Sequence, residues 1–171
     1  SGLALGALGY LFVVFFGSRN DLLLMTSFMF LGLSVGAAQT ISNDLILSSV
    51  PANKAGAASA ISETAYEFGT VLGTVVIGGM LTAIYRAQVT VPAGLNADAA
   101  HAAGETLGGA TAAAGQLPSD LSAELLHSAH AAFDAGVLVT ATFSAVLLAV
   151  LAVFTYRMLR SAPAELEKAE H

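Results

Sequence analysis

The sequence predicts an all-α membrane protein built as a bundle of four transmembrane helices. Of its 171 residues, 56% are hydrophobic and only 11% are charged, whereas roughly a quarter of the residues in an ordinary soluble domain are charged. The mean hydropathy is +0.74. The apolar residues gather into long uncharged runs, which the core of a soluble domain of this length does not need. These three observations exclude most water-soluble folds.

The charge and cysteine content exclude several classes of function. The 6 Lys and Arg against 12 Asp and Glu give a formal net charge of −6. Nucleic acids and anionic lipid surfaces are recognised by clustered cations, so we expect no nucleic-acid partner. Without cysteine the chain has no thiolate ligand. His127 and His130 bring no third ligand and suit a solvated helix face better than a metal site, so we expect no metal or cofactor.

The first two apolar runs predict two antiparallel helices joined by a polar turn at residues 18–21. Residues 1–17 hold an uncharged run that begins at Leu3 and ends at Gly17. As a helix this run is about 22 Å long, whereas about 30 Å is needed to span the hydrocarbon. We therefore interpret it as a truncated transmembrane helix. Residues 22–48 begin with an uncharged run that is long enough to span the membrane.

Proline ends the second helix, and two further transmembrane helices follow. Pro51 cannot continue a helix and disfavours the helical conformation in the residue before it, so a turn is expected there. Residues 55–85 form the third predicted helix, whose only charges are Glu63 and Glu67. Residues 133–157 form the fourth, and residues 158–171 are a tail.

The distribution of Lys and Arg orients the helices. Four of the six basic residues lie on the side of the second turn and the C-terminal tail, and two lie on the other side. The positive-inside tendency then places the tail in the cytoplasm and residues 87–132 outside it. In that connection Asn96 and Ser119 are suited to begin helices, the first of them ending near Ala114. The sequence does not decide between a loose helical hairpin and a flexible loop for this connection.

The third helix carries a polar stripe on one face. Glu63 and Glu67 are four residues apart, so on a helix they lie about 6 Å apart along the axis. Unpaired carboxylates in hydrocarbon cost several kcal/mol, so this face must meet water, a partner group or the bundle interior. Glu67 lies about 20 Å along the helix from Lys54, near the middle of a bilayer. The stripe, which covers an arc of about 80°, comprises Ser59, Glu63, Glu67, Thr70 and Thr74.

This stripe has the chemistry to bind protons and cations at one place. Carboxyl groups at this depth can take up and release protons. When ionised they offer a counter-charge to a cation, to which Tyr66 or Phe68 adds an aromatic face. The alternative is a hydrogen-bonded pair that locks two helices together and never exchanges a proton. The candidate substrate-binding or proton-binding residues are Glu63, Glu67, Tyr66, Thr70 and Thr74.

Small residues and methionines mark further helix faces. Gly69 and Gly73 form a ridge that lets another helix approach closely, and Gly32 and Gly36 form a similar pair in the second helix. Asp134, at the expected start of the fourth helix, is interpreted as a group that stabilises a helix N-terminus. The face of the second helix that holds its glycines either lines an adaptable cavity or packs on a neighbour; the other residues on it are Met25, Met29, Gln39 and Asn43.

The stretch from Val50 to Gly73, VPANKAGAASAISETAYEFGTVLG, resembles the thirteenth helix of the fourteen-helix drug:proton antiporters of the major facilitator superfamily. It is most similar to the EmrB/QacA type, which exports quaternary ammonium compounds and cationic dyes. The resemblance implies that the chain corresponds to helices eleven to fourteen of such a transporter in the bacterial inner membrane. It also implies that Glu63 and Glu67 take part in cation recognition or proton coupling, without assigning one role to each.

These inferences favour the C-terminal part of a proton-coupled multidrug efflux transporter that exports lipophilic cations by alternating access. Its expected partners are cationic drugs, protons, the lipid bilayer and the remaining helices of the same transporter. One alternative is a proton-coupled exporter of a neutral drug, lipid or metabolite. Another is a structural membrane subunit that transports nothing. An enzyme is not expected, because the buried residues supply no nucleophile with its base.

Overall fold

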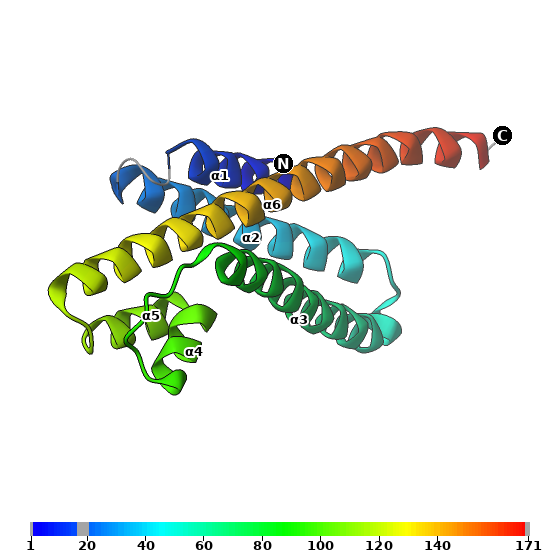
Figure 1. The fold of residues 1–171 in the computed structure, drawn as a ribbon. Helices are drawn as coiled ribbons and strands as arrows, with labels where there is room; N and C mark the ends of the chain where they lie inside the picture. Colours follow the sequence, from blue (N-terminus) through cyan, green and yellow to red (C-terminus); the bar gives the residue numbers. More distant parts are fainter. Residues whose placement is uncertain (1, 17–20, 170–171) are drawn as a thin grey trace. The chain divides into compact units, whose positions relative to one another are not determined.

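A computed structural model describes residues 2–16 and 21–169 of the chain, and the side chains of residues 2–15 and 22–158. Within this described part the regular structure is entirely helical (Figure 1). The helices are α1 (Gly2–Phe16), α2 (Asp21–Ser48), the short 3-10 helix η1 (Ala52–Lys54), α3 (Ala55–Gln88), α4 (Ala97–Glu105), α5 (Leu107–Ala114) and α6 (Ser119–Ala169).

Three segments are long and apolar enough to cross a membrane. They are Leu22–Ser48 in α2, Ala52–Gln88 in η1 and α3, and Ser119–Met158 in α6. Helix α1 is also apolar but shorter, with its apolar part at Gly2–Phe15. The protein is therefore an all-α membrane protein, and the predicted fold class is confirmed. Of the four expected spans, the last three correspond to these long segments, and the first corresponds to the shorter helix α1.

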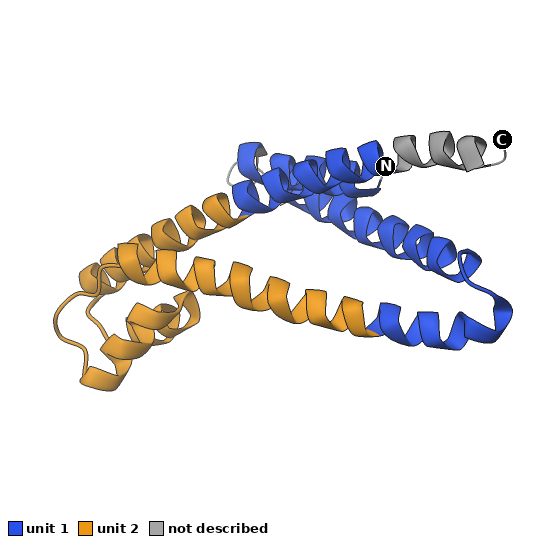
Figure 2. Ribbon diagram, turned by 90° about the vertical axis from the view of Figure 1, so that its right-hand side faces the viewer, with its two compact units in different colours: residues 1–63, 141–171 blue, residues 64–140 orange. Residues whose placement is uncertain are grey.

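The chain divides into two compact units (Figure 2). Unit 1 comprises Ser1–Glu63 and Ala141–His171, and unit 2 comprises Thr64–Thr140. Helices α3 and α6 each contribute to both units. Unit 1 therefore holds α1, α2 and one end of each long helix, whereas unit 2 holds the other ends together with α4 and α5.

In unit 1, α1 packs against α2 through glycines. A Cβ atom built on Gly6 would lie 2.5 Å from the Ser34 Oγ, and one built on Gly9 would lie 2.9 Å from the side chain of Leu31. The Ser34 hydroxyl donates a hydrogen bond of 2.7 Å to the carbonyl of Gly2. Residues of rising number in α1 meet residues of falling number in α2, so the two helices are antiparallel. The absence of side chains on α1 is what permits this close approach.

Unit 2 is held together by a small core made largely of alanine. Its buried members come from α3, α4, α5 and the first turns of α6: Tyr85, Ala103, Ala110, Ala113, Ala114, Leu125, Ala129 and Ala132. Alanine side chains are short, so the helices that carry them can approach closely. We call residues 85–133 the alanine module. The segment interpreted from sequence as a loose hairpin or a flexible loop is thus a set of packed helices.

Two capping residues divide the module into α4 and α5. The Asn96 side chain accepts a hydrogen bond of 2.8 Å from the Ala99 N–H, as its position predicted. The expectation of one helix to Ala114 is wrong, because Thr106 leaves the helical conformation and its hydroxyl caps α5 by accepting from the Gly109 N–H at 2.9 Å. A Cβ atom on Gly109 would lie 2.0 Å from the carbonyl oxygen of Ala102, so a glycine is needed at this junction.

Helix α6 begins at Ser119, well before residue 133, where the fourth span was expected to start. Its first turn follows Pro118, whose carbonyl accepts a 2.9 Å hydrogen bond from the Ser122 N–H and so occupies the capping position expected for Ser119. The helix then runs without interruption for 51 residues, about 76 Å. The interpretation of Asp134 as an N-terminal group is therefore wrong, since Asp134 lies well inside the helix. Its side chain instead marks the start of the uncharged run that ends before Arg157.

Replacing Thr106 by alanine is expected to destabilise α5 by about 1 kcal/mol, because the Gly109 N–H loses its acceptor. Thr111→Ala is the matched control, since the Thr111 hydroxyl donates to the carbonyl of Leu107 within the helix and caps nothing; this change should cost less than about 0.5 kcal/mol. Hydrogen–deuterium exchange of the α5 amides in the purified protein measures both. Equal protection in the two variants would contradict the capping role.

Candidate functional site

The predicted polar stripe lies on α3, and all of it is exposed. Because α3 is a continuous helix, its own geometry places the two carboxylates one turn apart on the same face. Neither Glu63 nor Glu67 makes an ion pair or hydrogen bond within the described part of the chain. The exposed side chains of the stripe are those of Ser59, Glu63, Glu67, Thr70 and Thr74.

Apolar side chains lie on another face of α3, about 120–140° around the helix from the centre of the stripe, and are also exposed. Phe68 is 67% exposed and Val75 is 65% exposed. An apolar face can contact lipid, but a carboxylate that faces lipid without a partner costs several kcal/mol. Two surfaces of different character therefore run along this part of α3. The apolar face suits lipid or another helix, and the acidic face needs water, a cation or a polar partner from outside the described residues.

The hydroxyl of Thr70, on the same face as the carboxylates, has a hydrogen-bond partner within α3. The Thr70 Oγ1 donates a hydrogen bond of 2.9 Å to the carbonyl of Tyr66, one turn earlier. This bond satisfies the hydroxyl proton inside the helix and leaves the oxygen able to accept from another donor. Thr70 therefore presents an acceptor, not a donor, on the acidic face. Such an acceptor suits a protonated carboxyl or a hydrogen-bearing cation.

Tyr66, beside the stripe, has a buried hydroxyl. The phenol oxygen is enclosed and has no hydrogen-bond partner among the described residues. A buried polar group without a partner costs about 1–3 kcal/mol, and native proteins rarely leave one unpaired. Water or a bound molecule would provide the missing partner. Tyr66 thus offers the site a polar group as well as the aromatic face that the sequence predicts.

The predicted face of α2 is likewise left uncovered by the residues that the structure describes. Helix α1 contacts the opposite face, where Ser27 and Ser34 are buried. A Cβ atom on Gly32 or Gly36 would meet nothing within 4 Å among the described residues, and the same holds for Gly69 and Gly73 in α3. It therefore stays a prediction that these faces pack on another helix or line a cavity, because no described residue covers them. The exposed residues on this face of α2 are Met25, Met29, Gly32, Gly36, Gln39 and Asn43.

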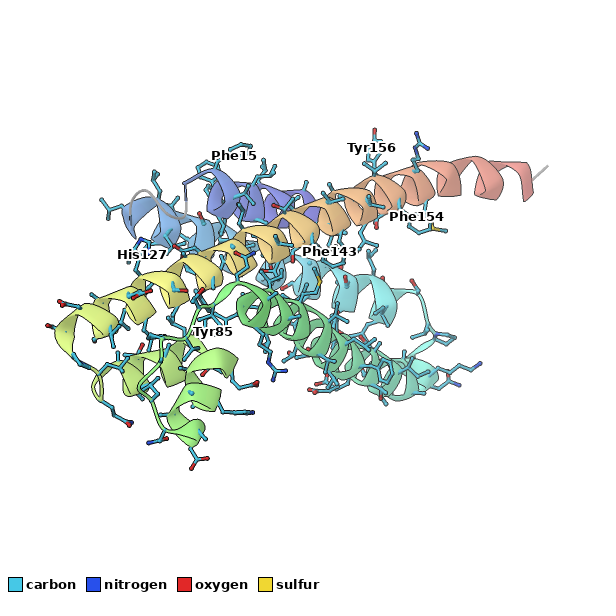
Figure 3. All side chains as sticks on the ribbon, in the orientation of Figure 1. Phe15, Tyr85, His127, Phe143, Phe154 and Tyr156 are labelled. Atoms are coloured by element: carbon cyan, nitrogen blue, oxygen red, sulfur yellow. The ribbon has the colours of Figure 1, made fainter. Side chains whose placement is uncertain are left out.

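The histidines of α6 lie away from the core of the alanine module. Leu125, Ala129 and Ala132 turn toward that core, and His127 is on the opposite side of the helix by the step of about 100° between residues. Figure 3 shows His127 projecting from α6, whereas Tyr85 lies between α3 and the small helices. Among the described residues no three His, Cys, Asp or Glu side chains come together as a metal site.

The end of α3 makes polar contacts that the sequence did not predict. The Tyr85 hydroxyl donates a hydrogen bond of 2.9 Å to the carbonyl of Ala103 in α4. The Arg86 guanidinium pairs with the carboxylate of Glu105. The Thr90 N–H donates to the Ser128 hydroxyl at 2.8 Å. A tyrosine next to an arginine at the end of an apolar run was the available signal for such an interface, but their partners depend on how α4 folds back.

These features define an all-α membrane protein with an exposed acidic stripe on a membrane-crossing helix. The chain is 49% identical over 151 residues to the multidrug efflux pump LfrA of Mycolicibacterium smegmatis, an alignment that covers 86% of this chain and 30% of LfrA. It is 37% identical over 103 residues to the methyl viologen resistance protein SmvA of Salmonella typhimurium, covering 60% of this chain and 21% of SmvA.

The chain therefore spans less than a third of the length of these relatives. No protein-family model matches it, and no solved structure does. The similarity to LfrA extends over most of this chain, so it includes both units and not just the acidic helix.

The two tyrosines of α3 are expected to respond differently to loss of the hydroxyl. Tyr85→Phe should cost about 1 kcal/mol because it removes a made hydrogen bond. Tyr66→Phe should be neutral or slightly stabilising, because its hydroxyl has no partner in the described chain. Thermal unfolding of the two purified variants against the unsubstituted protein measures the difference. An equal loss at Tyr66 would show that its hydroxyl is bound in the resting protein.

Proposed function

We propose that this chain is part of a multidrug efflux transporter that exports lipophilic cations in exchange for protons. The observation that carries the proposal is the pair of exposed carboxylates on a helix that is otherwise apolar enough to span a membrane. Intramembrane carboxylates are costly and are typical of substrate or proton pathways. The protein is on this proposal a transporter and not an enzyme.

The names of the relatives support the same function. LfrA is a multidrug efflux pump by name, and SmvA is named for resistance to methyl viologen, an organic cation. A lipophilic cation needs a counter-charge within an apolar surrounding, which Glu63 and Glu67 supply beside Phe68 and Tyr66. The chemistry of the stripe and the name of SmvA therefore both support a cationic cargo.

The position of Glu67 suits a central transport site. Along the apolar segment Ala52–Gln88, Glu67 lies about 20 Å from Lys54 and about 28 Å from Arg86, the charged residues near its two ends, so it lies well inside the segment. Transporters bind substrate and coupling ion near the bilayer midplane and expose the site to each side in turn. A proton that binds to the carboxyl pair reduces its negative charge and so weakens its hold on the cation, and loss of that proton restores the full counter-charge.

The proposal also covers the family of the complete protein and the orientation of its helices in the membrane. We infer that the complete protein is a major facilitator superfamily antiporter of the EmrB/QacA type in the bacterial cell membrane, and that its activity contributes to antibiotic resistance. The distribution of the basic residues supports an orientation in which the alanine module lies outside the cytoplasm and the end of α6 lies inside it. The uncovered faces of α2 and α3 would then contact the remaining helices of the same transporter, lipid or cargo.

Replacing either carboxylate should impair export of a monovalent cationic dye. In the full-length transporter, Glu67→Gln and Glu63→Gln keep the side-chain shape and remove the charge, so we expect efflux to fall about tenfold or more, corresponding to about 1.4 kcal/mol. Glu124→Gln, a carboxylate-to-amide change on the exposed face of the first turns of α6, is the control and should leave efflux unchanged. Dye efflux from loaded cells measures all three.

The outcome separates the proposal from its alternatives. Unchanged dye efflux in both variants, with proton movement still driven by a neutral drug, would favour an exporter of neutral cargo. Vesicles of the reconstituted transporter that move no protons with any tested drug would favour a structural subunit. Either result would overturn the proposed cation exchange.

A further inference from the structure

Helix periodicity links the acidic stripe to the far end of α3. With about 3.6 residues per turn, an α-helix returns a side chain to the same direction after every fifth turn. Five turns separate Leu81 from Glu63, and five turns separate Tyr85 from Glu67. The same face of α3 therefore carries carboxylates near its beginning and two large apolar or aromatic side chains near its end.

At that end the face is covered. Gly136 of α6 lies so close to α3 that a Cβ atom on it would be 2.8 Å from the Leu81 Cδ1 and 3.3 Å from the Leu81 carbonyl oxygen. Tyr85, one turn further on, is only 2% exposed and belongs to the core of the alanine module. Contact with α6 at Leu81 and burial of Tyr85 in the module thus close this part of the face.

The cover stops before the stripe begins. Thr74, two turns before Leu81, is exposed, and so are Thr70 and Glu67 on the same face. A Cβ atom on Gly78 would meet no described atom within 4 Å. The change from open to closed therefore falls within the two turns between Thr74 and Leu81, all inside unit 2.

Polar contacts brace the covered end. The Arg86 pair with Glu105 joins α3 to α4, and the Thr90 N–H joins the chain after α3 to Ser128 of α6. These contacts and the alanine core hold the ends of α3 and α6 together around Leu81 and Gly136. To separate the helices at that level, the core around Tyr85 must also loosen.

We propose that Leu81, Tyr85 and Gly136 form a seal that closes the acidic stripe on the side of the alanine module. The proposal rests on the proposed transport function, because a seal has meaning only where cargo or protons reach the stripe. With the seal closed, the carboxylates are reached from the other end of α3. Release of cargo on the module side requires α6 to move away from α3 at Gly136. The three seal residues control access to the stripe and do not contact the cargo.

The absence of cysteine from this chain gives a direct test. In the full-length transporter, with any cysteine elsewhere replaced, a single Thr74→Cys reports on access to the stripe. A membrane-impermeant maleimide is applied to right-side-out or inside-out vesicles from the side of the alanine module. Labelling of Thr111→Cys, at an exposed position of α5, identifies which vesicles present that side. We expect Thr74→Cys to react at least tenfold more slowly than Thr111→Cys.

Opening the seal should raise the rate of labelling at Thr74→Cys about tenfold. Gly136→Val forces α6 away from Leu81, and Leu81→Ala removes the side chain without a clash, so one of the two remains informative if the other fails to fold. Gly104→Val is the matched control, since a Cβ atom there meets nothing within 4 Å in the described chain; it should leave the rate unchanged.

Fast labelling of Thr74→Cys with the seal intact, or no rise in either seal variant, would overturn the seal. The two proposals fail separately. Labelling rates report on access whether or not the cargo is a cation, and dye efflux by Glu67→Gln reports on the cargo whether or not the seal exists.

Discussion

Hydrocarbon solvates neither a carboxylate nor an unpaired backbone group, and this constraint governs the whole chain. It explains why the regular structure of the described residues is helical, because a helix satisfies its backbone hydrogen bonds internally. The same constraint limits what the two glutamates of α3 can face. Charged groups on a helix that is apolar enough to span a membrane must face water, a polar partner or cargo. The proposed transport role of α3 rests on that cost more than on any contact among the described residues.

Close approach through small residues is the second theme of the structure. Helix α1 lies against α2 because Gly2, Gly6 and Gly9 carry no side chains, and α6 lies against Leu81 because residue 136 is glycine. In the alanine module the helices approach one another through alanine side chains, and the Tyr85 hydroxyl adds a hydrogen bond between α3 and α4. Small residues give little apolar area, so these interfaces depend on fit and on a few polar contacts.

Several features of the structure were predictable from local sequence. The uncharged runs predicted the long apolar helices, Pro51 predicted the break before α3, and Asn96 predicted the start of α4 through its capping side chain. The stripe of Glu63, Glu67, Thr70 and Thr74 needed only the period of a helix. The expected helix from Asn96 to Ala114 is interrupted because Thr106 leaves the helical conformation and caps α5. Ser119, which was expected to begin a helix, is the first residue of α6.

The sequence by itself determined that the chain is a helical membrane protein with a pair of acidic residues on its third long helix, because hydropathy and helical spacing are properties of consecutive residues. The tertiary structure alone decided which glycines pack and which stay open, and that the segment after α3 is a folded module held by Tyr85 and Arg86. It also revealed that the acidic face of α3 continues into a covered end at Leu81. Those outcomes depend on which residues distant in sequence come within a few ångströms of one another, and no local pattern specifies that.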